Sequence, residues 1–192
     1  IDDNIYIWTG TATQYKVNLL RKFFEQYKQD PSDLVFFLDD SKGIGSDEEI
    51  ERYKIRRKYW ESVLPSLQEA TGTFLNISPS KNNSIMGATA RSGVYLCCVA
   101  NYDSARVEIF IDQGDYQKNR AIYKRLEQNR DAIEAAYGKS LNWVCQDDVR
   151  ACKVYDEIKE VSIKNEEDRP VMSAFHIQRA KALLVATKQF LA

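Results

Sequence analysis

The segment ARVEIFIDQGDYQKNR, residues 105–120, contains Glu108 and Asp112, whose carboxylates are spaced so that they could bind a metal ion together. Apolar side chains at 107, 109 and 111 alternate with other residues, which is the period of a strand with one face in a core. The pattern then becomes helical, and Asp115 stands where a helix cap is expected. We therefore interpret Glu108 as the polar side of a strand and Asp112 as a loop residue before the helix, not as metal ligands.

A second stretch, QDDVRACKVYDEIKE at residues 146–160, contains the residue types of a magnesium-dependent nuclease. Such a site needs carboxylates that converge on a hard cation, usually with a lysine beside the attacking water. Asp147 or Asp148, followed by Glu157 and Lys159, fits the acid and the (D/E)xK element of PD-(D/E)xK nucleases. Glu-x-Lys is also a common solvated pair on strand surfaces. Catalysis by Asp148, Glu157 and Lys159 with Mg²⁺ is therefore the alternative, and we expect no catalytic residue, metal or cofactor.

Basic and aromatic side chains are concentrated in RYKIRRKYW, residues 52–60. Basic side chains can bind the phosphates of a nucleic acid, and aromatic rings can stack on its bases. Tyr59 and Trp60 are better explained as core residues of an amphipathic helix. The basic side of such a helix, which we call its shoulder, is commonly exposed to solvent without binding a ligand. The candidate nucleic-acid-binding residues are Arg56, Arg57 and Lys58 on this shoulder, with Arg91 beside an SG turn and Arg106 at a strand start.

The histidine and the cysteines give no clear reactive site. His176 lies between apolar neighbours, and no serine or cysteine of the sequence is in a recognisable nucleophile motif with it. We therefore interpret it as a packed or a surface residue, not a catalytic one. The four cysteines form no CxxC pair and no zinc-finger spacing. We interpret them as buried thiols of a reducing compartment, with the adjacent Cys97 and Cys98 on opposite faces of a strand.

Composition indicates an ordinary globular chain. Hydrophobic residues make up 44% and charged residues 29% of the 192 residues, and the net charge is -1. The whole-protein field therefore would not attract nucleic acid or an anionic membrane, and any such binding needs a local patch. No apolar run approaches the roughly 20 residues of a membrane span, and no signal region is apparent. We expect a cytoplasmic protein without a membrane partner.

Helical and strand patterns divide the chain at a loop-like linker, DDSKGIG. Residues 1–45 read as an N-terminal helical appendage or the end of a removed domain, and residues 46–192 as the main domain. A capping box at Ser46 and Glu49 predicts a long helix that ends at Gly72. Four strands should follow at 73–78, 84–89, 93–102 and 105–112, and then a helix over 115–138. The segments near 141–145 and 150–163 should form two further strands, or one strand and an irregular hairpin, before a last helix from Pro170. This order predicts an α+β fold, a mostly antiparallel sheet packed by long helices.

Several fragments in a fixed order carry a family resemblance: RRKYWESVLP, SPSKNNSIMGA, ARSGVYL, the segment from ARVEIFID to EAAYG, and LNW. Together they resemble DUF4268, a domain family of bacteria and archaea, over about residues 48–192. Similar family members often end longer proteins that carry a restriction-type nuclease-like or other DNA-processing domain. Ala90 stands where the family form has glycine, and the resemblance supplies no catalytic role for Arg91.

The resemblance implies an accessory module. We expect a non-catalytic domain of a bacterial DNA-processing or restriction-type protein, which contacts nucleic acid or associates with protein. A divergent PD-(D/E)xK nuclease is one alternative. A module for protein–protein interaction or dimerisation alone is the other.

Overall fold

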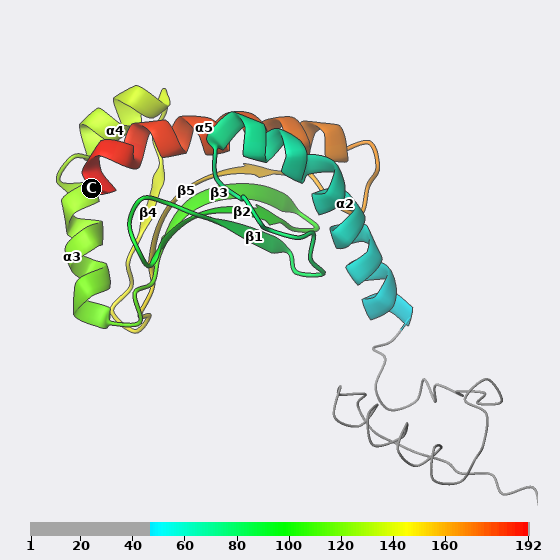
Figure 1. Cartoon of the computed structure of the whole chain (residues 1–192), viewed down its shortest axis with the longest axis horizontal. Coiled ribbons are helices and arrows are strands. Elements are labelled where there is room, and N and C mark those ends of the chain that lie inside the picture. Colours follow the sequence, from blue (N-terminus) through cyan, green and yellow to red (C-terminus); the bar gives the residue numbers. More distant parts are fainter. Residues whose placement is uncertain (1–46, 192) are drawn as a thin grey trace, which may run out of the picture. The chain divides into compact units, whose positions relative to one another are not determined.

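The computed structural model describes residues 47–191 (Figure 1). The expectations for residues 1–45, and for the cap at Ser46, lie outside this range. The elements in chain order are α2 (Asp47–Thr71), β1 (Ser84–Ala88), β2 (Val94–Ala100), β3 (Ser104–Ile111), α3 (Tyr116–Glu127), α4 (Arg130–Tyr137), β4 (Asn142–Val144), β5 (Cys152–Lys159) and α5 (Arg169–Leu191).

The strands form one five-stranded sheet in the order β1-β2-β3-β5-β4, and every neighbouring pair is antiparallel. β3 is the central strand. It pairs with β2 through Leu96 opposite Ile109, and with β5 through Val154 opposite the same residue. The predicted α+β class, with a largely antiparallel sheet, is confirmed.

The helices α2 and α5 lie across one face of the sheet, the helix face (Figure 1). Directly opposed residues of antiparallel strands point to the same face, so the row Leu96, Ile109 and Val154 belongs to it. These three side chains have no exposed surface. The other fully buried large side chains of this core include Trp60 and Leu67 of α2 and Met172 and Leu183 of α5.

The opposite face of the sheet is concave and is covered by none of the helices in the described range (Figure 1). We call it the open face. The cross-strand register gives its rows. They are Tyr95, Phe110 and Lys153; then Cys97, Glu108 and Tyr155; then Val99, Arg106 and Glu157.

Residues 73–78 are not the predicted strand. Phe74 and Asn76 have positive φ angles of 61° and 65°, which a strand does not contain. The segment instead passes closely over β1, where a Cβ on Gly87 would lie 2.9 Å from the backbone nitrogen of Phe74. The side chain of Phe74 is thereby buried in the core.

The helix expected over 115–138 is two helices. The chain leaves helical geometry at Asn129, with φ -111° and ψ 21°, between α3 and α4. The side chain of Asn129 donates to the carbonyl of Arg125 at 2.8 Å, so it satisfies a terminal carbonyl of α3. The predicted ends hold, since Asp115 caps α3 and Gly138 ends α4 in the left-handed region at φ 92°.

Candidate functional site

The acids of the nuclease alternative lie far apart. Asp148 is in the loop that connects β4 to the start of β5 at Cys152. Glu157 and Lys159 are near the opposite end of β5. At about 3.3 Å per residue, the strand alone separates Cys152 from Glu157 by roughly 16 Å. Asp147, the other candidate, pairs with Arg120 at 3.5 Å. No group of three or more histidines, cysteines or acids in the described range could hold a metal ion.

A shallow cavity of about 600 Å³ does include Glu157 and Lys159. It lies where the β2–β3 turn meets the end of β5, and Asp103, Glu160 and Asp168 add further carboxylates. Asp168 is already engaged, because its Oδ2 accepts from the amide of Ser162 at 2.9 Å. A lining of four acids and one lysine disfavours a phosphate ligand here.

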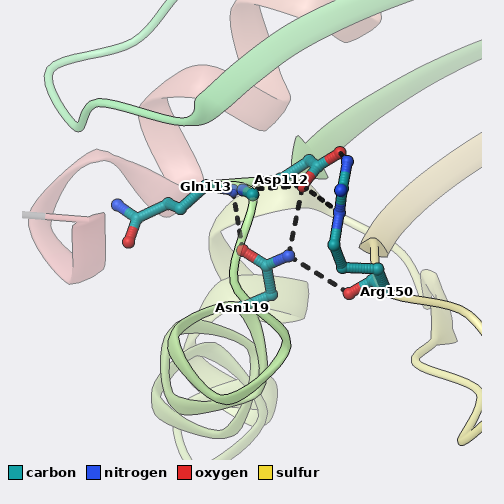
Figure 2. A network of polar contacts seen from close by, with 5 residues as sticks. Asp112, Gln113, Asn119 and Arg150 are labelled. Carbon is teal, nitrogen blue, oxygen red and sulfur yellow. Dashed lines mark hydrogen bonds and ion pairs between the residues drawn. The ribbon is translucent and has the colours of Figure 1, made fainter.

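Asp112 anchors a loop through several hydrogen bonds (Figure 2). Its carboxylate accepts two hydrogen bonds from Arg150, at 2.9 and 2.6 Å, and one from the amide of Gly114 at 2.9 Å. The hydrogen bond from Arg150 is the main cause that holds the pKa of Asp112 below its usual value. Asp115 accepts from the amide of Lys118 at 2.8 Å. The interpretation of these acids as loop and cap is confirmed.

Glu108 is not the solvated residue that strand alternation predicts. It lies on the open face but is only 6% exposed. Its Oε2 lies 2.9 Å from Nε of Arg106, and neither atom makes an aligned hydrogen bond. Its cross-strand partners are Cys97 and Tyr155, and sequence alternation carries no information about this pairing.

Two cations flank one aromatic ring on the open face. The guanidinium carbon of Arg106 lies 5.1 Å from the ring centroid of Tyr155, and Nζ of Lys153 lies 5.6 Å from the same centroid. These distances are within cation–π range. Tyr95 and Phe110 stand in the same row as Lys153, and both are partly exposed. The open face therefore combines stacking surfaces with positive charge.

Of the five predicted nucleic-acid-binding residues, Arg106 alone lies on the open face. Arg91 donates to the carbonyl of Leu191 at 3.4 Å, at the end of α5. Arg56 lies 5.8 Å from the ring centroid of Tyr102, at the β2–β3 turn. The other two are exposed on α2, where Arg57 pairs with Glu61 at 3.1 Å and Lys58 is its chain neighbour.

The five residues thus do not form a single patch. Sequence reasoning missed Lys153, Tyr155, Tyr95 and Phe110 as binding candidates. The signal for the first two was present, because the alternation of CKVYDEIK puts Lys153 and Tyr155 on the face opposite Cys152 and Val154.

His176 is packed, which is one of the two positions predicted for it. It has no exposed surface, and its Nε2 lies 3.1 Å from the carbonyl of Val99. Burial lowers its pKa to about 4. The imidazole is therefore neutral near pH 7, and its role is structural, as a hydrogen-bonded part of the core.

The cysteines divide into two pairs. Cys97 and Cys98 are free and buried, as predicted, and burial raises the pKa of both thiols. For the second pair the prediction was wrong, since Cys145 and Cys152 form a disulfide. The β4–β5 register puts them opposite each other, which their separation of seven residues does not reveal.

A family model described as a domain of unknown function, DUF4268, matches residues 55–191. The chain belongs to the DUF4268 family. The match runs from within α2 to the end of α5, so the DUF4268 domain comprises the whole sheet and its helices. No curated protein and no solved structure matches the chain. Within the described part of the chain, no helix has the length and apolarity needed to cross a membrane.

Proposed function

We propose that this DUF4268 domain is a non-catalytic accessory domain that binds single-stranded nucleic acid on the open face of its sheet. The observation that carries the proposal is the ring of Tyr155 between Arg106 and Lys153. The resemblance seen in the sequence suggests a setting in a bacterial DNA-processing or restriction-type protein.

The chemistry of the open face suits unpaired bases. Sheets that bind single strands stack bases on exposed aromatic side chains and hold phosphates with arginine and lysine. Tyr95, Phe110 and Tyr155 supply three rings in two adjacent rows, and Arg106 and Lys153 supply charge beside them. A duplex keeps its bases stacked inside, so these rings favour a single strand.

The charge distribution limits the expected affinity. Glu108 and Glu157 share the open face with Arg106 and Lys153, and the chain as a whole carries a net charge of -1. Long-range attraction is therefore weak, and binding depends on close contacts that salt screens. We expect stacking to contribute more than electrostatic steering.

The test is fluorescence anisotropy with labelled single-stranded DNA, single-stranded RNA and duplex DNA over a range of salt concentrations. Tyr155→Ala should weaken single-strand binding by about 5- to 150-fold, since stacking contributes roughly 1–3 kcal/mol per base. Arg106→Ala and Lys153→Ala should weaken binding and reduce its salt dependence. The matched control is Arg125→Ala, which removes an exposed cation from the last turn of α3.

Two results would contradict the proposal. One is the absence of binding to every probe at low salt. The other is loss of binding in Arg57→Ala and Lys58→Ala but not in the open-face variants, which would favour the shoulder of α2. In the first case sedimentation of the chain, alone and with candidate proteins, tests self-association and protein partnering instead. The nuclease alternative has no comparable support, because Asp148 lies apart from Glu157 and Lys159.

A further inference from the structure

The disulfide of Cys145 and Cys152 closes the β4–β5 hairpin at its loop end. Val144 pairs with Lys153, so the next position of the antiparallel ladder brings Cys145 opposite Cys152. Their Cα atoms are 4.4 Å apart, close to the spacing of a non-hydrogen-bonded pair. The two sulfurs are therefore placed together by the hairpin itself.

The two sulfurs have different surroundings. Cys152 is 1% exposed, whereas Cys145 is partly exposed. Nη1 of Arg120 lies 3.7 Å from Sγ of Cys152. Arg120 stays in place because it stacks on the ring of Tyr116 and donates to the carbonyl of Gln146. A guanidinium thus stands beside the buried Cys152, and Cys145 is the more exposed cysteine of the two.

We propose that Cys145 and Cys152 form a reversible thiol–disulfide exchange site for low-molecular-weight thiols. A thiolate attacks Sγ of Cys145, forms a mixed disulfide there and expels Cys152 as a thiolate. A second thiolate attacks the sulfur of the bound small thiol, which releases the oxidised small molecule as its disulfide and leaves Cys145 as a thiolate. Two electrons pass from the two small thiols to the protein, and both cysteines then take up a proton from water. Oxidation follows the same steps in reverse.

Arg120 favours this course because a positive charge beside Cys152 stabilises the leaving thiolate. A thiol of lower pKa leaves faster in exchange. In the reverse direction, the same charge raises the fraction of Cys152 that is thiolate and able to attack the mixed disulfide. Arg120 acts through the cysteine sulfur, so it is a positioning residue of the exchange.

The loop between the cysteines has other anchors, which keep the sulfurs close after reduction. The hydroxyl of Tyr116 donates to the carbonyl of Asp147 at 2.8 Å. Nδ2 of Asn119 donates to the carbonyl of Arg150 at 3.1 Å, and the guanidinium of Arg150 is held by Asp112 (Figure 2). Because these hydrogen bonds hold the loop, the two reduced cysteines should stay close enough to form the disulfide again without rearrangement of the hairpin.

The other two cysteines supply an internal control. Cys97 and Cys98 are neighbours on β2, so their side chains point to opposite faces of the sheet and cannot pair with each other in the strand. Both are buried, at 1% and 0% exposure. They should stay reduced and unreactive in the folded chain whatever the state of Cys145 and Cys152. This site does not depend on the proposed nucleic-acid binding.

The test equilibrates the full chain in glutathione buffers of graded reduced-to-oxidised ratio, traps thiols by alkylation and locates them by peptide mass spectrometry. Cys145 and Cys152 should change together in one reversible transition, with a mixed disulfide at Cys145 as the trapped intermediate. Arg120→Gln should slow reduction by dithiothreitol roughly threefold for each unit by which the Cys152 thiol pKa rises. Arg125→Gln, an exposed arginine of the same helix, is the matched control and should leave the rate unchanged.

Cys145→Ser and Cys152→Ser provide the folding control. Both should melt cooperatively, because the loop anchors remain, and Cys145→Ser should leave Cys152 more reactive to alkylation than Cys97 or Cys98. The proposal is overturned if the pair stays reduced in the most oxidising buffer, or if it is reduced only after denaturation. An unchanged reduction rate in Arg120→Gln would overturn the part assigned to Arg120.

Discussion

The hydroxyl of Tyr59 in α2 and Nδ1 of His176 in α5 are 2.8 Å apart in the buried core. The carbonyl of Val99 can only accept, and it faces Nε2 of His176, so Nε2 carries the proton of the neutral ring. Nδ1 is therefore the acceptor, and Tyr59 donates to it. Two helices and strand β2 are joined through one imidazole.

Tyr59→Phe should lower the free energy of unfolding by about 1–3 kcal/mol, because it leaves Nδ1 of His176 buried without a partner. Urea denaturation at neutral pH measures the change. Tyr102→Phe is the matched control, since Tyr102 is 43% exposed, and its midpoint should remain near that of the parent chain. Equal effects of the two substitutions would contradict the proposed hydrogen bond.

The stability of the domain should fall as the pH is lowered from about 7 to about 5. The pKa of His176 is about 4 in the folded chain, below the value of roughly 6.5 expected for an unfolded histidine. The unfolded state thus binds the proton first, and the stabilisation is full above pH 6.5 and lost towards pH 4. The full difference is about 3 kcal/mol.

His176 is the single histidine of the chain, so its replacement isolates this contribution. Denaturant melts of the parent chain and of His176→Gln, at several pH values between about 7 and about 5, make the comparison. The variant should be less stable at neutral pH but should change less with pH. An identical pH dependence in both proteins would show that acids, not His176, cause it.

Asp112→Ala should destabilise the domain more than Arg150→Gln. The alanine removes the acceptor for Arg150, for the amide of Gly114 and for Asn119, and we expect a loss of about 1 kcal/mol. Arg150→Gln removes only an exposed partner. Denaturant melts rank the two variants, and hydrogen exchange of the β4–β5 loop should increase in both. The reverse ranking would mean that the guanidinium anchors the loop by contacts other than Asp112.

The order and type of most elements could be predicted from the sequence because their signals are local. Alternation around Ile109 gave the central strand, Asp115 gave the start of α3, and Pro170 marked the first turn of α5. The fold class followed from strands linked by short turns. These features depend on neighbours in the chain, so a single sequence contains them.

Most of the misses depend on contacts that strand pairing and packing create, and the break of the predicted helix at Asn129 is the local exception. Glu108 is buried beside its cross-strand partners Cys97 and Tyr155, and the pairing of Cys145 with Cys152 comes from the register of β4 and β5. Residues 73–78 have strand composition, but their packing over Gly87 determines their conformation. The open face was missed for the same reason, because it exists only once β2, β3 and β5 lie side by side.

Ile109→Asp should abolish cooperative unfolding, since it puts an unpaired charge at the centre of the helix face, where Ile109 has no exposed surface. Ile109→Val, which keeps the branched shape, should cost about 0.5–1.5 kcal/mol. Glu108→Gln leaves the packing but removes the charge beside Arg106, and should cost less than Ile109→Asp while keeping the transition cooperative. Thermal melts by circular dichroism separate these outcomes, and a cooperatively melting Ile109→Asp would refute the core assignment.

The last prediction separates the accessory domain from the nuclease alternative. A PD-(D/E)xK site requires its carboxylates to bind one Mg²⁺ with oxygens at about 2.0–2.1 Å. Asp148 is in the loop beyond Cys152, and Glu157 lies five positions along β5 from that cysteine, roughly 16 Å away. The Asp112–Arg150 hydrogen bonds hold the loop at the Cys152 end of β5, so no small movement brings Asp148 to Glu157.

The purified chain should therefore leave plasmid and oligonucleotide substrates intact with Mg²⁺ or Mn²⁺. Glu157→Ala should bind single strands as the parent does or slightly more tightly, because it removes a carboxylate from the open face. Metal-dependent cleavage that Glu157→Ala eliminates while the domain still melts cooperatively would establish the nuclease and refute the non-catalytic assignment.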